Sequence, residues 1–488
     1  MTKIKQLFSQ AFLQKLLLIY LFCQPIIDIG TSLLKHAGYD VTIGVVLRAI
    51  FLLFMGLYLL FFDRGPRRKL ICAYLIALCA YVLLQNLLLL ANGGAHVLFT
   101  NLKETIKVFY FPCVLIAFWA LYRQFGYLLP EKPIAWIATF YALTIFISYV
   151  TGTSFQSYKD NGYCGWFYAA NEISALIIIL SPLVFYHYTT EKALDTLRSS
   201  TAGKRLLYAG VGVLSVLLML FASVYLATKA ALIGVAVYLV CFFVWSVFRL
   251  EITRSRLARF RMLAAGLMIA ALAVLYFAAS PVRMNITDRM KWFHYIQVEN
   301  TTVVTTPKPE ETTALTPKPA DDTKTYRVLN WLLSSRLNNI RSTNAQFGES
   351  GPAFWALGIG YADLPTYRYH VEVAVEMDFV SVFYRHGVVG LLLFTAPFVA
   401  ILFAAIRMAF RNLKACMASL LWCTTLYQTM IGFAVGFLAG HTLVAPAVSL
   451  YEAIVLTRLY AVTSKCIEPS EESQPLPPMT KPKTNAEA

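Results

Sequence analysis

The sequence predicts an all-α protein that crosses a membrane many times, and three observations lead to this prediction. Hydrophobic residues make up 58% of the 488 residues and charged residues only 14%, whereas charged residues are about a quarter of a typical soluble protein. Apolar runs of about twenty residues, the length of a membrane-spanning helix, recur along the chain. The runs are continuous rather than alternating, which indicates helices and not the strands of a membrane barrel.

About twelve of these runs are long enough to span a membrane. The first follows residues 1–10 without a small-residue cleavage site, so we do not expect a cleaved secretory signal. The expected spans lie at about 13–34, 43–62, 70–91, 104–122, 133–151, 167–188, 206–226, 230–249, 262–282, 379–407, 415–438 and 443–462.

Basic residues determine the expected orientation of the spans. They cluster in alternate connections, and such connections stay on the cytoplasmic side of a plasma membrane. Both termini are therefore expected in the cytoplasm, and the net charge of +16 reflects topology rather than binding to nucleic acid. The basic residues are Lys3 and Lys5; Arg64, Arg67, Arg68 and Lys69; Lys192, Arg198, Lys204 and Arg205; Arg249, Arg254, Arg256, Arg259 and Arg261; and Arg407, Arg411 and Lys414.

One long connection, at about 283–375, is then expected outside the cell. Its first part repeats 306–309 as 316–319 in a tract rich in Thr, Pro and acidic residues, which indicates a disordered insert at about 301–323. The part at about 325–375 has a helical apolar pattern, and we expect it to fold back onto the membrane domain. The predicted organisation is nine spans at 1–282, this extracellular loop, three spans at 376–465 and a disordered cytoplasmic tail at 466–488.

Ionisable residues gather near the outer ends of the spans, where charge is costly and usually functional. Lys103 and Lys107 are four residues apart and share a helix face. An electropositive site under the long loop would bind an anionic lipid headgroup through its phosphate oxygens. Structural interpretations stay open, because basic residues near span ends can reach lipid phosphates and acidic ones can form buried hydrogen bonds. The residues are Asp28, Arg48, Lys103, Glu104, Lys107, Glu172 and Lys229, with Arg336, Glu376 and Asp378 in and after the loop.

Metal and disulfide patterns are not evident in the sequence. No His or Cys spacing typical of a metal site occurs, and we expect no metal and no other cofactor. Of the nine cysteines, Cys164 alone lies in a candidate external loop, so a disulfide framework is not expected.

Four segments together resemble the O-antigen ligase/O-antigen polymerase family of membrane glycosyltransferases. Residues 167–172, which include Asn171, resemble the family's Asn-containing segment, and residues 227–234 resemble its Thr-Ser-Arg segment with Lys229 in place of arginine. Arg336 and the later Gly-Ile-Gly-Tyr turn at 358–361 resemble the loop arginine and Gly-x-Gly turn. The interval from Glu376 to Gly387 has the spacing of the family's His-x10-Gly motif.

The resemblance implies a GT-C-like enzyme that assembles bacterial surface polysaccharide such as O antigen, capsule or exopolysaccharide. A polymerase or ligase of this kind transfers a glycan from an undecaprenyl-diphosphate-linked donor to an acceptor hydroxyl at the outer face of the membrane, with inversion. It needs no nucleotide sugar. The implied partners are the lipid-linked oligosaccharide, membrane lipid and other polysaccharide-assembly proteins.

The implied site needs cations, because negative charge grows on the diphosphate as its bond to the sugar breaks. We expect Arg336 to act in catalysis and to bind the diphosphate together with Lys229. Further candidates for binding the diphosphate are Arg48, Lys103 and Lys107. The supporting residues would be Asn171, Glu172, Gly358, Gly360 and Gly387.

The sequence departs from the family at the expected base. Family ligases carry histidine and then asparagine where this chain has Glu376 and Met377. A carboxylate can also accept a proton, and Asp378 follows two residues later, so both carboxylates stay open. If the segment is helical, Glu376 and Gly387 lie on nearly one face; the alternation at 371–376 instead allows an extended approach to the span.

Two other classes of function remain as alternatives. Twelve spans would suit a secondary transporter or a flippase for lipid-linked oligosaccharide, and residues 63–69 resemble a loop of major facilitator transporters. However, the glycine that precedes that loop motif is Leu59 here, and no internal repeat is evident between the two halves. A non-enzymatic membrane scaffold would leave the charges at the outer side unexplained.

Overall fold

The computed structural model describes residues 9–39, 42–93, 96–126, 129–157, 162–278, 280–299, 326, 330, 333, 336–348, 350–361 and 375–466. Helices dominate these residues and surround one large buried core, which confirms the all-α membrane fold. The expected insert at about 301–323 lies outside the described residues, as do residues 467–488 of the expected tail.

Each expected span corresponds to one long helix of the structure. The twelve helices are α2 (Gln10–His36), α3 (Ile43–Phe61), α4 (Arg68–Gly93), α5 (His96–Phe125), α6 (Glu131–Val150), α7 (Ala170–His187), α9 (Ala202–Tyr225), α10 (Lys229–Thr253), α11 (Arg256–Phe277), α16 (Asp378–Arg411), α18 (Leu420–Leu438) and α19 (Pro446–Lys465). Within the described part of the chain, eleven helices are long and apolar enough to cross a membrane, and α19 is the one of the twelve that is not among them.

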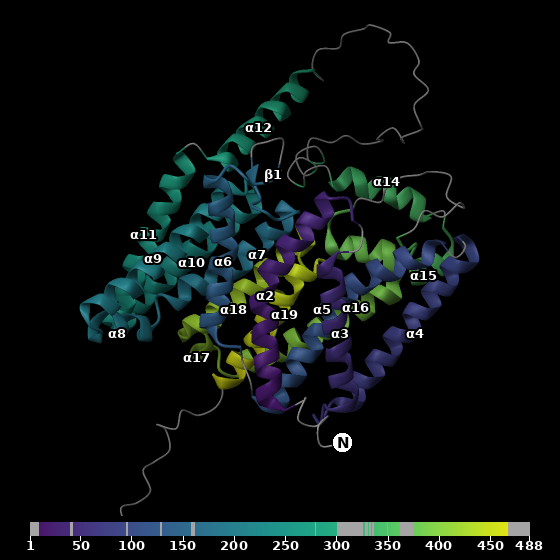
Figure 1. Ribbon diagram of the computed structural model, residues 1–488, viewed down its shortest axis with the longest axis horizontal. Coiled ribbons are helices and arrows are strands. Elements are labelled where there is room, and N and C mark those ends of the chain that lie inside the picture. Colours follow the sequence, from purple (N-terminus) through teal and green to yellow (C-terminus); the bar gives the residue numbers. More distant parts are fainter. Residues whose placement is uncertain are drawn as a thin grey trace, which may run out of the picture.

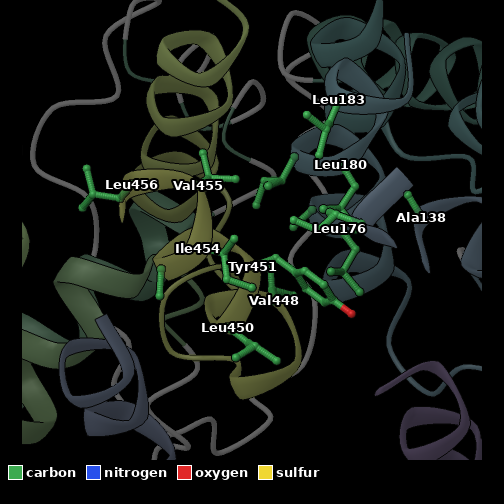
Figure 2. Packing of buried hydrophobic residues seen from close by; sticks show 14 of the residues in the cluster. Ala138, Leu176, Leu180, Leu183, Val448, Leu450, Tyr451, Ile454, Val455 and Leu456 are labelled. Atoms are coloured by element: carbon green, nitrogen blue, oxygen red, sulfur yellow. The ribbon is translucent and has the colours of Figure 1, made fainter. Parts of the chain in front are cut away.

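Helix α19 is less apolar than the others because it lies inside the bundle. It is buried almost without a break from Ala447 to Val462, and it packs against α5, α16, α18 and α7. Figure 2 shows Val448 and Tyr451 of α19 beside Leu176 of α7. A helix enclosed by protein does not need an apolar surface for lipid, so α19 can carry polar residues that the outer helices lack.

Elements other than the twelve long helices lie at the two ends of the bundle (Figure 1). Helices α12 (Pro281–Glu299) and α14 (Arg336–Gly348) lie at one end, near the hairpin of β1 (Gln156–Ser157) and β2 (Gly162–Tyr163). This hairpin is antiparallel and pairs Gln156 with Tyr163. Helices α8 (Glu191–Ser199) and α17 (Leu413–Ala418) lie at the other end. We call the first of these the α14 end of the bundle.

Helices α14 and α15 (Pro352–Leu357) pack onto the start of α16 through a second, smaller apolar cluster. Phe347 of α14 is its centre and contacts the rings of Trp355, Phe383 and Tyr384. The side chain of Asn344 accepts a hydrogen bond from the Tyr384 hydroxyl. The segment that follows the expected insert is therefore joined to the bundle by both apolar packing and hydrogen bonds.

Two glycines allow the backbone after α15 to touch α16. Gly358 has φ +84° and Gly387 has φ +65°, values that glycine adopts without strain. A Cβ atom at Gly358 would overlap the carbonyl group of Arg385, and one at Gly387 would overlap the carbonyl group of Ala356. The contact continues as the amide of Ile359 donates to the Tyr384 carbonyl at 3.0 Å.

Helix α16 is kinked at Gly387, and side chains of α4 bond to the carbonyl groups there. Nε2 of Gln85 donates to the carbonyl oxygens of Leu357 at 2.8 Å and Arg385 at 2.9 Å. The Tyr81 hydroxyl donates to the carbonyl oxygen of His386 at 2.9 Å. Such partners are needed because an unpaired carbonyl within a membrane domain costs several kcal/mol.

Candidate functional site

A cross-link at the α14 end joins three segments that are far apart in the sequence. Nη2 of Arg336, the first residue of α14, donates to Oε2 of Glu376 at 2.5 Å and to the carbonyl oxygen of Ala439 at 3.1 Å. Nη1 donates to the carbonyl oxygen of Leu333 at 3.3 Å. The side chain of Arg336 is 12% exposed and that of Glu376 is 44% exposed, so solvent reaches the pair mainly on the carboxylate side.

Glu376 lies before α16 and not on it, so the expectation that Glu376 and Gly387 share a helix face is wrong. Met377 is extended, with φ −76° and ψ 119°, and the helix begins at Asp378. The alternation at 371–376 was the signal for this extended approach, although residues 371–374 lie outside the described part. The backbone of Glu376 packs against Gly440, where a Cβ atom would overlap the Glu376 carbonyl oxygen.

The second candidate carboxylate, Asp378, has a different environment. It is fully buried, and its two oxygens accept three backbone hydrogen bonds. Oδ1 accepts from the amide of His441 at 2.8 Å, and Oδ2 accepts from the amides of Thr442 at 3.0 Å and Leu443 at 2.7 Å. Asp378 therefore holds the connection between α18 and α19 against the start of α16.

That connection carries a histidine which the sequence did not single out. His441 has φ +60°, in the left-handed region, and follows Gly440 with φ +76°. Its side chain is half-buried. The available signal was weak: a Gly-His pair just after the expected span at 415–438, on the same side of the membrane as Glu376.

Glu172, in the first turn of α7, interacts electrostatically with His441 of this connection. Its side chain is half-buried. Asp28, Arg48 and Lys107 are further charged groups that act on its carboxylate. Asn171 precedes Glu172 in the same turn.

Arg48 is directed into the bundle, where its charge is balanced. It is buried, forms an ion pair with Asp28 and donates to Oε1 of Gln24 at 3.1 Å. The second oxygen of Asp28 accepts from the Tyr141 hydroxyl at 2.6 Å. Arg48 thus does not extend to lipid phosphates, and any anion would have to compete with Asp28 for it.

The lysines expected at the site lie on α5 and α10. Nζ of Lys107 lies 2.7 Å from Oε1 of Glu104, and Nζ of Lys103 lies 3.7 Å from the same oxygen. Two lysines that share one carboxylate leave one positive charge. Lys229 begins α10 immediately after Thr228, whose hydroxyl is 2.6 Å from that of Ser174 on α7.

The Gly-Ile-Gly-Tyr turn at 358–361 links the α15–α16 contact to α5. Nη1 of Arg385 donates to the carbonyl oxygen of Gly360 at 2.8 Å, and its guanidinium lies 5.0 Å from the centre of the Tyr361 ring. The amide of Tyr361 donates to Oδ1 of Asn101 at 3.2 Å. Burial raises the pKa of the Tyr361 hydroxyl, so this group stays protonated at neutral pH.

The site as a whole places a guanidinium, two carboxylates and an imidazole at the α14 end of a membrane bundle. Among the described residues, no three His, Cys, Asp or Glu side chains converge as ligands for a metal ion. The arrangement can bind an anion at Arg336 and exchange protons beside it.

Comparison with known families identifies the chain. A model of the family described as O-antigen ligase like membrane protein matches residues 10–465, from the start of α2 to the end of α19. The chain belongs to the O-antigen ligase-like family. No curated protein matches its sequence. Membership confirms the resemblance seen in the four segments and supports a multi-pass membrane enzyme of surface polysaccharide assembly.

The described part of this O-antigen ligase-like protein contains a histidine close to Glu376 in the fold. His441 follows Gly440, which packs against the Glu376 carbonyl, and its amide donates to Asp378.

Proposed function

We propose that this O-antigen ligase-like protein is a polymerase or ligase of bacterial cell-surface polysaccharide. It transfers a glycan from an undecaprenyl-diphosphate-linked donor to an acceptor hydroxyl at the outer face of the plasma membrane, with inversion at the sugar. The observation that carries the proposal is the setting of Arg336 at the α14 end of the bundle. The family match over residues 10–465 supports the general reaction class.

Arg336 has the properties of a diphosphate-binding group. Hydrogen bonds to the Leu333 and Ala439 carbonyls fix its guanidinium in place. Its Nε is buried and has no hydrogen-bond partner within the described part of the chain. A phosphate oxygen would satisfy this donor, and the planar guanidinium matches phosphate geometry in a way that a lysine does not.

The carboxylate of Glu376 forms an ion pair with the guanidinium of Arg336 before the donor binds. A diphosphate carries more negative charge than a carboxylate, so it competes for the guanidinium and displaces the partly exposed Glu376 side chain. Until the donor arrives, the ion pair with Glu376 keeps the guanidinium of Arg336 in a fixed orientation. Such preorganisation lowers the cost of stabilising charge in the transition state.

The transfer step forms one bond and breaks another. The acceptor oxygen attacks the sugar C1 opposite the diphosphate, and the electron pair of the C1–O bond leaves with undecaprenyl diphosphate. Arg336 stabilises the charge that develops on the leaving group, and Lys229, Lys103 and Lys107 add to the positive field around it. Arg48 adds little net charge because Asp28 neutralises it.

The acceptor hydroxyl must also lose its proton to a base beside Arg336. Of the two carboxylates expected from the sequence, Asp378 is the less suitable, because it is fully buried and three backbone amides occupy its oxygens. Glu376 is more accessible and lies next to the proposed diphosphate site. Of these two carboxylates, Glu376 is therefore the one that lies beside the proposed diphosphate site.

Reconstitution tests the proposed function. Full-length protein in liposomes is given an undecaprenyl-diphosphate-linked oligosaccharide, and the products are separated by size and by lipid attachment. We expect glycan that has left its original lipid, either as polymer or on a new acceptor. Movement of intact donor across the bilayer with no change of bonds would contradict the proposal and indicate a flippase or transporter.

A further inference from the structure

The connection between α18 and α19 presents an imidazole beside the Arg336–Glu376 pair. The Ala439 carbonyl accepts a hydrogen bond from Arg336, and Gly440 packs against the Glu376 carbonyl. His441 is the next residue of the connection. The two residues before His441 thus contact both members of the ion pair, which links His441 to the proposed diphosphate site.

The backbone of His441 is held in a conformation that it would not adopt freely. A left-handed φ of +60° costs a non-glycine residue about 1–2 kcal/mol. The carboxylate of Asp378 offsets this cost by accepting from the amides of His441, Thr442 and Leu443. Strained conformations that the surroundings enforce are concentrated at functional sites, and here the fixed backbone determines where the imidazole lies.

Charged groups from several helices lie around His441. Glu172 of α7 interacts with it electrostatically. Asp378 lies behind it on α16, and the Arg336–Glu376 pair lies beside it at the starts of α14 and α16. Arg336 opposes a positive charge here, but its own charge is balanced by Glu376 or, in the reaction, by the diphosphate.

The carboxylate of Glu376 is engaged by the guanidinium of Arg336. It would have to give up this ion pair to accept the proton of an acceptor hydroxyl. An imidazole with a carboxylate partner is the group that enzymes use most often to accept a proton near neutral pH. His441 and Glu172 supply these two parts.

We propose that His441 is the base that accepts the proton of the acceptor hydroxyl, and that Glu376 is a positioning residue for Arg336. This inference rests on the proposed function. As the acceptor oxygen bonds to the sugar C1, its proton passes to a ring nitrogen of His441, and the C1–O electron pair leaves with the diphosphate. Glu172 stabilises the imidazolium, which releases the proton to water after the product departs.

The left-handed backbone makes a clean test available. Glycine adopts φ +60° without strain, so His441→Gly removes the imidazole, preserves the backbone and leaves a space for free imidazole. His36 is a matched control, because it is an exposed histidine at the end of α2. Each full-length variant is measured in liposomes with the undecaprenyl-diphosphate-linked oligosaccharide, for turnover and for donor binding.

We expect His441→Gly to reduce turnover about 100-fold or more while donor binding changes less than about twofold. Added imidazole should restore part of the activity. The wild-type protein should lose activity on acidification, because a base must be unprotonated to act, and His441→Gly should lack this dependence. His36→Asn should behave as wild type, and Glu376→Gln should retain the pH dependence whatever its turnover.

Two results would overturn the inference and leave the proposed function intact. One is turnover in His441→Gly within about twofold of wild type. The other is loss of the pH dependence in Glu376→Gln together with a His441→Gly defect that imidazole does not restore. If His441→Gly fails to fold, His441→Asn answers the same question, because asparagine tolerates the left-handed conformation. Absence of glycan transfer by the wild-type protein would overturn the proposed function, and the inference with it.

Discussion

The guanidinium of Arg336 lies 2.5 Å from the carboxylate of Glu376, and the same nitrogen also donates to the Ala439 carbonyl. The ion pair joins α14 to the residue that precedes Met377 and α16. It also sets up a competition, because an anionic ligand of Arg336 must replace Glu376.

This competition predicts that Glu376→Gln binds the donor more tightly than the wild type. Glutamine keeps the shape of the side chain and loses the charge, so the diphosphate no longer displaces an ionic partner. We expect an affinity higher by about 1.5-fold to fivefold, the effect of one partly exposed ion pair. Binding of labelled undecaprenyl-diphosphate-linked oligosaccharide to the purified variant measures it. Weaker binding than wild type would show that Glu376 helps to hold the donor.

Asp378 should be essential for the structure of the site. In the wild type, three backbone amides donate to the Asp378 carboxylate. Asparagine keeps one carbonyl oxygen but directs an NH2 group toward these donors. We expect Asp378→Asn to lower the free energy of unfolding by about 2–5 kcal/mol and to reduce turnover with it. Thermal unfolding in detergent is the measurement. A variant with normal stability and no turnover would instead indicate direct participation in the reaction.

Gly387 should not tolerate even alanine. Its φ of +65° and the overlap of a Cβ atom with the Ala356 carbonyl would force α15 away from α16. We expect Gly387→Ala to unfold at a lower temperature and to lose activity. Gly210 in α9 is the matched control, since a Cβ atom there meets nothing within 4 Å and alanine should stabilise the helix slightly. Equal unfolding temperatures for the two variants would contradict the close contact.

The positions of the membrane helices could be predicted from the sequence because lipid imposes a length and an apolar composition. This held even for α19, whose apolar residues fill the protein core instead of facing lipid. Helical spacing also predicted that Lys103 and Lys107 share a face, and Glu104 between them joins that face in the structure. These features depend on residues that are close together in the chain.

The site itself depends on contacts between distant segments, which local patterns do not specify. Arg336 could be identified as important, but its contact with Ala439 could not. The prediction that Glu376 and Gly387 share a helix face was wrong because the helix begins only at Asp378 and is kinked at Gly387. His441 was missed because its importance comes from a backbone angle and from its amide bond to Asp378, neither of which has a sequence signature.

The proposed orientation can be checked at the β1–β2 hairpin, which lies toward the α14 end (Figure 1). Gln156 is exposed, so Gln156→Cys should react with a membrane-impermeant maleimide in intact cells. The native Cys164 should not react, because it is 2% exposed and burial raises the pKa of its thiol to about 11. At pH 7 this leaves roughly one thiol in ten thousand as the reactive thiolate. Labelling of Gln156→Cys only after lysis would reverse the orientation.

The central claim is that Arg336 stabilises the departing diphosphate, and the rate of a single turnover at saturating donor tests it most directly. Release of undecaprenyl diphosphate is followed for the wild type, Arg336→Ala, Arg336→Lys and the control Arg341→Ala. Arg341 is on the same helix as Arg336, and its exposed guanidinium lies over the Tyr326 ring. We expect Arg336→Ala to be about 100-fold slower or more, Arg336→Lys to recover only part of the rate, and Arg341→Ala to match the wild type. A rate for Arg336→Ala within about twofold of the wild type would contradict the claim.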